Sequence, residues 1–238
     1  MEIEIWSDVV CPWCWIGTRH LQEALATFPH ADEVEVVYRS FLLDPSAPVG
    51  GTEPTLDVLA RKYGGGRAGA EQMVDRVEAV AAEAGLLMRL RETVSYSTVD
   101  AHRVLHLALE QGGPALQRQV KEAFLAAHFT EARNLGDHAV LRATAVAAGL
   151  DGADVDAVLA SDRFTEEVFA DVARAQAYGA TGVPFTVVDR AYGVPGAQPA
   201  AAFTQVLERA WADAHPAPLV TTTGGTVCDG DGCAVPER

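Results

Sequence analysis

Residues 2–16 read EIEIWSDVVCPWCWI, and the pattern of this stretch decides the fold. Its first part alternates polar and apolar side chains, which predicts a β-strand over Glu2–Trp6. Residues 33–38 read EVEVVY and predict a second strand. The apolar residues between these two strands have helical spacing, and the predicted helix begins at the segment that contains Cys11 and Cys14. The opening is therefore β-α-β, the unit that builds a parallel sheet.

The two cysteines lie three residues apart at the start of the predicted helix. A thiol reacts as its thiolate, and the unpaired N–H groups at a helix N-terminus favour an anion there. Cys11 takes this position, and Pro12 suits the first helical residue. Cys14 lies one turn further along the same face, where it can attack a mixed disulfide held on Cys11. We therefore predict thiol–disulfide exchange, with Cys11 attacking, Cys14 resolving, and Pro12 and Trp13 at the substrate-binding surface.

Composition argues against several other function classes. The chain has 238 residues, 49% of them hydrophobic, and a formal net charge of -15. Such a chain can bury a substantial core, while its charge disfavours binding to nucleic acid or to an anionic membrane. No apolar run approaches the roughly 20 residues that span a bilayer, and the N-terminus carries no signal-peptide pattern. We expect a cytoplasmic protein that uses no cofactor and no metal ion.

The remaining chain changes its pattern twice. Residues 44–52 are rich in Pro and Gly and mark a boundary, after which the apolar spacing is helical for more than a hundred residues. Residues 184–188 then predict a strand, and residues 191–194 can return antiparallel after a tight turn. Pro199 begins a last helix. These patterns indicate a mixed sheet interrupted by helices.

Two motifs together resemble those of a known family. The string SDVVCPWC at residues 7–14, followed far downstream by TGVPF at residues 181–185, resembles the DsbA-like thioredoxin superfamily, and most closely the FrnE-like dithiol oxidoreductases. The resemblance implies an α/β, thioredoxin-like fold with an inserted all-helical domain. It also implies a cis peptide bond before Pro184, facing the dithiol, so that Val183 and Pro184 bind an extended substrate segment.

The resemblance and the patterns together suggest three parts. We expect a thioredoxin-like domain formed by residues 1–46 and 162–214, an inserted helical domain at 47–161, and a flexible tail at 215–238. The expected partners are protein thiols and disulfides, with glutathione or another thiol as a candidate reductant.

A second cysteine pair lies in the tail. Residues 228–233 read CDGDGC, and their glycines allow the chain to bring Cys228 and Cys233 together. A disulfide that closes so short a loop adds little to folding. We therefore hypothesise a second redox pair that exchanges with the first one, and an inert tail is the alternative.

Other interpretations of the cysteines remain open at this stage. Cys11 and Cys14 could be small buried hydrophobic residues, or all four cysteines could bind zinc. The kappa-type glutathione transferases and 2-hydroxychromene-2-carboxylate isomerases share the architecture, but they typically carry a serine or lack the second cysteine, which favours dithiol exchange here. A thiol-bearing chaperone that holds unfolded chains through Trp13 and Trp15 is a non-enzymatic alternative.

Three further polar residues are weaker candidates. Asp8 precedes the dithiol and could either influence the proton transfers of Cys14 or be a solvated loop acid. His102 and His106 lie one turn apart on a predicted helix, but without a third ligand nearby they receive no role.

Overall fold

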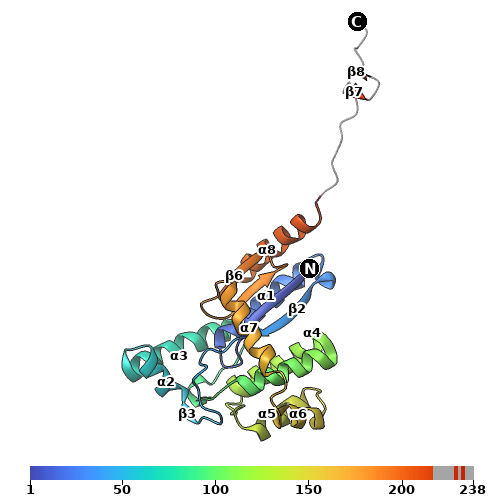
Figure 1. Cartoon of the computed structure of the whole chain (residues 1–238). Helices are drawn as coiled ribbons and strands as arrows, with labels where there is room; N and C mark the ends of the chain where they lie inside the picture. Colours follow the sequence, from blue (N-terminus) through green and yellow to red (C-terminus); the bar gives the residue numbers. More distant parts are fainter. Residues whose placement is uncertain (217–227, 230–231, 234–238) are drawn as a thin grey trace.

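The computed structural model describes residues 1–216, 228–229 and 232–233, and Figure 1 shows how their elements are arranged. Its centre is a four-stranded mixed sheet in the order β2-β1-β5-β6. Strand β1 pairs parallel with β2 and antiparallel with β5, and β5 pairs antiparallel with β6. The strands are β1 (Glu2–Ser7), β2 (Glu35–Ser40), β5 (Phe185–Val188) and β6 (Tyr192–Pro195). The chain is thus an α/β protein whose sheet begins and ends as the sequence pattern predicts.

Helices cover both faces of this sheet. Helices α1 (Pro12–Thr27) and α8 (Ala200–Ala214) pack on one face, where Ile3 and Ile5 of β1 meet Leu207. Helix α7 (Thr165–Ala177) packs on the other face, against Trp6. Because successive side chains of a strand point to opposite faces, β1 contributes to both cores.

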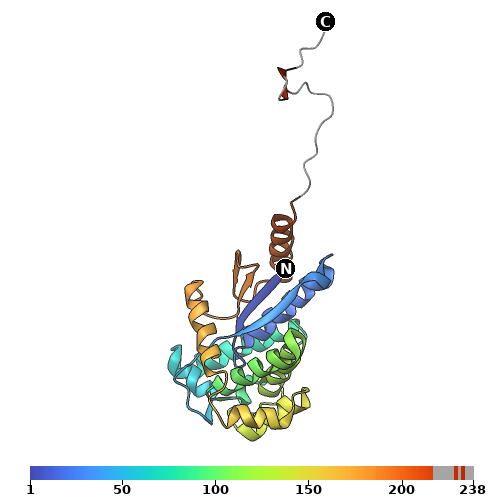
Figure 2. The same ribbon diagram turned by 45° about the vertical axis from the view of Figure 1, so that its right-hand side comes forward.

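The segment between β2 and β5 is mostly helical. Helix α4 (Val99–Phe129) is broken at Gly112 and Gly113, where the φ of Gly113 is 63°, and Pro114 starts its second half. Helices α5 and α6 lie at the end of the molecule opposite α8 (Figure 2). The helices are α2 (Thr55–Lys62), α3 (Gly66–Glu83), α4 (Val99–Phe129), α5 (His138–Ala147) and α6 (Gly152–Leu159).

Two local features differ from the sequence-based expectation. Strand β2 begins at Glu35 rather than Glu33, because Ala31–Glu33 form a 3-10 turn. A two-stranded pair, β3 (Glu53–Pro54) with β4 (Val94–Ser95), also lies within the helical segment, next to the 3-10 turn Leu90–Glu92. Strands of two residues are too short to show an alternating pattern.

The described part of the tail is a short antiparallel pair. Strands β7 (Cys228–Asp229) and β8 (Gly232–Cys233) place the two cysteines opposite each other in the register. The predicted flexibility of the tail concerns residues that lie mostly outside the described ones.

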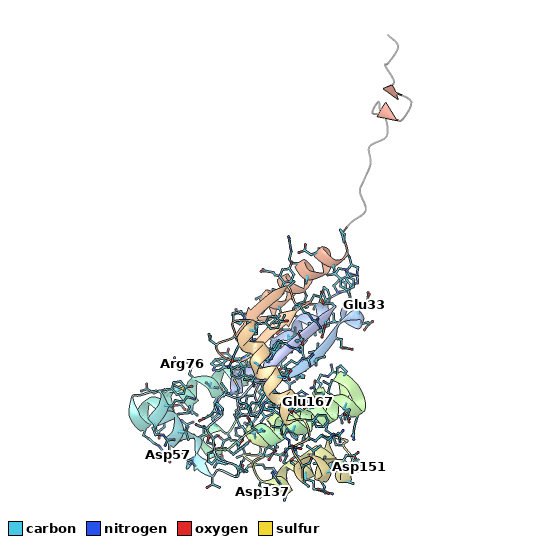
Figure 3. The ribbon with its side chains drawn as sticks, viewed as in Figure 1. Glu33, Asp57, Arg76, Asp137, Asp151 and Glu167 are labelled. Atoms are coloured by element: carbon cyan, nitrogen blue, oxygen red, sulfur yellow. The ribbon has the colours of Figure 1, made fainter. Side chains whose placement is uncertain are left out.

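The negative charge is distributed over the surface. Acidic side chains from widely separated elements are exposed in Figure 3, namely Glu33, Asp57, Asp137, Asp151 and Glu167. Among the described helices, none combines the length and the apolar character needed to cross a membrane.

Candidate active site

The dithiol lies at the start of α1. Cys11 is the N-cap residue with extended backbone angles, and Pro12 follows in the first turn. The backbone N–H of Cys14 donates to the carbonyl of Cys11 at 3.1 Å, which places Cys14 in the first helical turn. Both residues are thiols and both are buried, with 3% of Cys11 and 1% of Cys14 exposed.

A loop before β5 faces Cys11. The Cys11 Sγ donates to the carbonyl oxygen of Val183 at 3.5 Å, and the Val183–Pro184 peptide bond is cis, the form that the family resemblance implies. Pro184 in turn accepts a backbone hydrogen bond from Gly196 at 2.8 Å, at the end of β6. The structure therefore brings Cys11 and Val183, 172 residues apart in the sequence, into contact.

A glycine allows this loop to approach the helix. A β-carbon on Gly17 of α1 would lie 3.2 Å from Cγ of Pro184 and 3.3 Å from the backbone of Ala197. The absence of a side chain at this position lets the proline pack directly on the helix that carries the dithiol.

A cavity of about 440 Å³ opens beside the attacking thiol. Cys11, Pro12, Trp13 and Val183 form one part of its lining, and residues of α2, α3, the segment 90–98 and His128 of α4 form most of the rest. Its lining also contains large apolar side chains that are well exposed: Trp13 (38%), Tyr63 (60%) and Met73 (37%). Cys14 is absent from this lining, so the cavity gives access to Cys11 and not to its mate.

Asp8 lies buried behind the dithiol and is not a solvated acid. Its Oδ1 accepts from the N–H of Val9 at 2.7 Å and lies 3.2 Å from Nε2 of His102, while Oδ2 accepts from Leu43 N–H at 2.9 Å. Burial raises the pKa of Asp8, but the interactions with His102, the hydrogen bond from Leu43 and the charge of Lys121 together outweigh burial, so the pKa lies below its ordinary value. Burial lowers the pKa of His102 despite this contact. The pair is an aspartate held by a neutral imidazole at pH 7.

Lys121 of α4 is a residue that sequence reasoning missed. It is 2% exposed, and its charge acts on Cys14. Burial raises the pKa of the Cys14 thiol well above its ordinary value, Cys11 raises it further, and Lys121 lowers it. A signal was present in the sequence, because Lys121 follows Val120 and precedes Phe124 on the buried stripe of its helix, where a charged residue is out of place.

Two other residues have structural roles. Trp15 is buried, its Nε1 donates to Glu122 at 3.0 Å, and its ring stacks on Phe129 at 6.0 Å, so the expectation that it offers aromatic surface to a substrate is wrong. His106 lies 3.2 Å from Asp171 and 3.1 Å from the Ser40 hydroxyl, which joins α4 to α7 and β2.

The metal alternative concerns residues that are only partly described. The described residues contain no group of three or more His, Cys, Asp or Glu side chains able to hold a metal ion. A zinc site of all four cysteines would need the side chains of Cys228 and Cys233, which lie outside the described ones.

Comparison with known proteins agrees with the fold and with the family resemblance. The family model of the DSBA-like thioredoxin domain matches residues 2–208. A probable DsbA oxidoreductase from Streptomyces coelicolor is 46% identical, with a TM-score of 0.85, and the match covers 100% of both chains. The chain belongs to the DsbA-like thioredoxin domain family, which is a family of disulfide oxidoreductases.

More distant similarities are of two kinds. A 2-hydroxychromene-2-carboxylate isomerase has a TM-score of 0.65 at 14% identity, over 90% of this chain and 98% of its own, which shows a shared fold alone. The uncharacterized protein YwbO from Bacillus subtilis is 27% identical over 164 residues, which cover 67% of this chain and 72% of that protein.

Proposed function

We propose that this chain is a thiol–disulfide oxidoreductase that exchanges disulfides with protein substrates through Cys11 and Cys14. The observation that carries the proposal is the position of Cys11. It caps α1, it lines the open cavity, and its Sγ contacts the carbonyl of Val183 in the loop before β5. Helix N–H groups on one side and an accessible surface on the other are what an attacking thiolate requires.

The proposed reaction consists of two exchanges. The Cys11 thiolate attacks one sulfur of a substrate disulfide, forms the Cys11–substrate bond and releases the other substrate sulfur as a thiolate. The Cys14 thiolate then attacks Cys11 and releases the second substrate sulfur. The substrate disulfide is reduced to two thiols, and the Cys11–Cys14 pair is oxidised by the same two electrons. The same steps in reverse transfer the disulfide to a reduced substrate.

The surroundings of Cys11 favour a polypeptide as the substrate. The backbone of Val183 lies next to the thiol and can pair with an extended segment, as an added strand does. Trp13, Tyr63 and Met73 surround the cavity with exposed apolar surface, which suits apolar side chains that flank a substrate cysteine. Pro12 and Pro184 hold the two sides of this site in place.

Glutathione fits the cavity less well. Its two carboxylates require cationic partners, yet the basic residues that line the cavity are Lys62 and His128. Burial lowers the pKa of His128 to about 4, so this imidazole is neutral at pH 7. We therefore assign glutathione, or another small thiol, the role of a general reductant of the dithiol, and not that of a bound co-substrate. This chemistry also accords with action in the cytoplasm.

The tail is proposed as a second redox pair. The strand register sets Cys228 opposite Cys233, and thiols in a short glycine-containing loop can exchange with the Cys11–Cys14 disulfide. A Cys228→Ser/Cys233→Ser variant tests this role. We expect the variant to keep the first turnover and to be re-reduced more slowly; unchanged multiple turnover and an unchanged reduction potential would make the tail inert.

The proposed activity is tested by disulfide formation in a reduced, unfolded protein substrate. Oxidised wild-type protein should restore the native disulfides of the substrate at catalytic amounts when an oxidant is supplied. Cys11→Ser should abolish this turnover, whereas the exposed change Arg118→Ser should not affect it. Turnover that survives in Cys11→Ser would exclude the proposed activity, and suppression of substrate aggregation by the same variant would instead favour the chaperone alternative.

A further inference from the structure

Lys121 combines complete burial with the lack of a hydrogen-bond partner. Its Nζ makes no hydrogen bond to any described residue, and only 2% of the residue is exposed to solvent. Burying an amino group without a partner costs free energy, because the group loses its hydration and gains nothing in return. Replacing it with an apolar side chain would remove this cost, so a lysine at this position points to a function in its neighbourhood.

The surroundings of Lys121 connect it to the dithiol. Gln117, one turn earlier on α4, exchanges two hydrogen bonds of 2.9 Å with the backbone of Tyr38 in β2, which fixes this part of the helix against the sheet. The Lys121 Nζ lies 5.9 Å from the centre of the Tyr38 ring. On α1, the Thr18 hydroxyl donates to the carbonyl of Cys14 at 2.9 Å, and the Tyr38 side chain contacts Thr18. Tyr38 and Thr18 therefore connect the buried ammonium group of Lys121 with the helical turn that carries Cys14.

The charged groups that act on Lys121 come from the redox site. They are Cys14 and Cys11 of α1 and Asp8 of the segment between β1 and α1, while His102 on its own helix is engaged by Asp8. Burial lowers the pKa of Lys121, and Cys14 is the first of the three groups that raise it again. The interaction is mutual, because Lys121 lowers the pKa of Cys14, which burial raises.

We propose that Lys121 is the charge-compensating residue of the resolving step, whose buried ammonium group stabilises the thiolate that Cys14 must become before it attacks Cys11. The inference rests on the proposed function and assigns it a residue from the helical segment. Lys121 is a positioning residue and not a catalytic one, because its charge acts on Cys14 through space.

The step balances without a further reactant. Cys14 gives up its proton, its sulfur forms a bond to Cys11 Sγ, and the bond between Cys11 and the substrate sulfur breaks. The substrate leaves as a thiolate and takes up one proton from solvent, which replaces the proton lost by Cys14. Lys121 keeps its proton throughout, and its positive charge offsets the negative charge on Cys14 where no water is available to do so.

The two steps can be measured separately with Ellman's reagent, an aromatic disulfide. In the Cys228→Ser/Cys233→Ser background, which removes the two tail thiols, the reduced protein releases one coloured thiolate when Cys11 attacks the reagent and a second one when Cys14 resolves the mixed disulfide. In Lys121→Met we expect the second phase to slow by about tenfold at pH 7 and its pH midpoint to rise by about one unit, with a smaller change in the first phase. The control Arg118→Met changes an exposed cation on the same helix and should leave both phases unchanged.

Stability gives a second readout that a merely structural lysine would not satisfy. Met fills nearly the same volume without a charge, so Lys121→Met should be at least as resistant to urea as the wild type, while it resolves more slowly. Lys121→Arg keeps the charge and should recover part of the rate of the second phase. Loss of stability with an unchanged pH profile would overturn the inference.

A direct titration of Cys14 gives a third readout and compares the wild type with both Lys121 variants. With Cys11 blocked by iodoacetamide, the pH midpoint of Cys14 should rise when Lys121 is changed to Met. It should stay close to the wild-type value in Lys121→Arg, because arginine retains the positive charge. A Cys14 midpoint that is the same in all three proteins contradicts the inference. Absence of the first phase in the wild type would instead contradict the proposed function itself.

Discussion

Helix α4 carries two buried histidine–carboxylate pairs one turn apart, and they differ in what surrounds them. His102 faces Asp8, both of whose oxygens are engaged, by Val9 and His102 on one side and by Leu43 on the other. His106 faces Asp171, and in the described part of the chain only Oδ2 of Asp171 is engaged, by His106 and the N–H of Ser40. Asp8 of the first pair lines the cavity and its charge acts on Lys121, whereas the second pair joins secondary-structure elements.

This difference shows that position, and not residue type, separates a functional pair from a structural one. A histidine and an aspartate are in contact and buried at both places. Only the pair next to Cys11 and Cys14 can influence sulfur chemistry, because charge interactions weaken with distance even in a buried environment.

The largest expected effect comes from replacing the two aspartates. Asp8→Asn puts an amide NH2 against a backbone N–H or His102, so we expect a loss of about 3–5 kcal/mol in the free energy of unfolding. It also removes the charge that helps keep Lys121 protonated, so the pH profile of the resolving step should shift. Asp171→Asn can turn its carbonyl oxygen towards Ser40 and should cost about 1 kcal/mol. Urea unfolding and the two-phase kinetic experiment check both variants; equal costs and equal pH profiles would remove the distinction between the pairs.

A third histidine of α4, His128, extends the comparison to the stability of the protein at low pH. His128 lines the cavity, lies 2.8 Å from the Tyr96 hydroxyl, and burial lowers its pKa to about 4. The unfolded chain therefore takes up a proton on this histidine below about pH 6.5 that the folded chain does not, so the folded state should lose about 3 kcal/mol as the pH falls from about 6.5 to about 4.

The variant His128→Gln isolates this contribution. Gln can still hydrogen-bond to Tyr96, but it does not titrate, so urea unfolding measured as a function of pH should become flatter over the same interval. An equally steep dependence in the variant would mean that other groups, and not His128, bind the protons.

The smallest expected effect compares two glycines near Pro184. A β-carbon on Gly17 would meet Pro184 and Ala197, whereas one on Gly182 would meet nothing within 4 Å. Gly17→Ala should therefore displace the loop from α1, cost about 1 kcal/mol and slow the attack by Cys11 several-fold. Gly182→Ala is the control and should be close to neutral in thermal unfolding and in exchange kinetics; the reverse order of effects would contradict the proposed role of the Gly17–Pro184 contact.

Local patterns in the sequence were sufficient for the framework of the fold. The alternation in Glu2–Trp6 predicted β1, and the turn between β5 and β6 has Asp189 and Arg190 at positive φ values of 47° and 56°, as a tight hairpin requires. The family resemblance supplied the contact between Val183 and Cys11. The division into two domains and the roles of the site residues stay predictions.

Other parts could not be read from the sequence because they depend on tertiary packing. Asp8 and Trp15 lie just before and just after the dithiol, and both are buried by segments far along the chain, which no local pattern shows. Lys121 is separated from Cys14 by more than a hundred residues, so only the three-dimensional structure shows that its charge acts there.

The most direct test of the central claim is to identify which cysteine holds the substrate. Cys14→Ser should trap a substrate protein as a mixed disulfide on Cys11, which mass spectrometry of proteolytic fragments would locate at that residue, and Cys11→Ser should trap none. A mixed disulfide found on Cys14 in the Cys11→Ser variant, or none on Cys11 in the Cys14→Ser variant, would contradict the assignment of Cys11 as the attacking thiol.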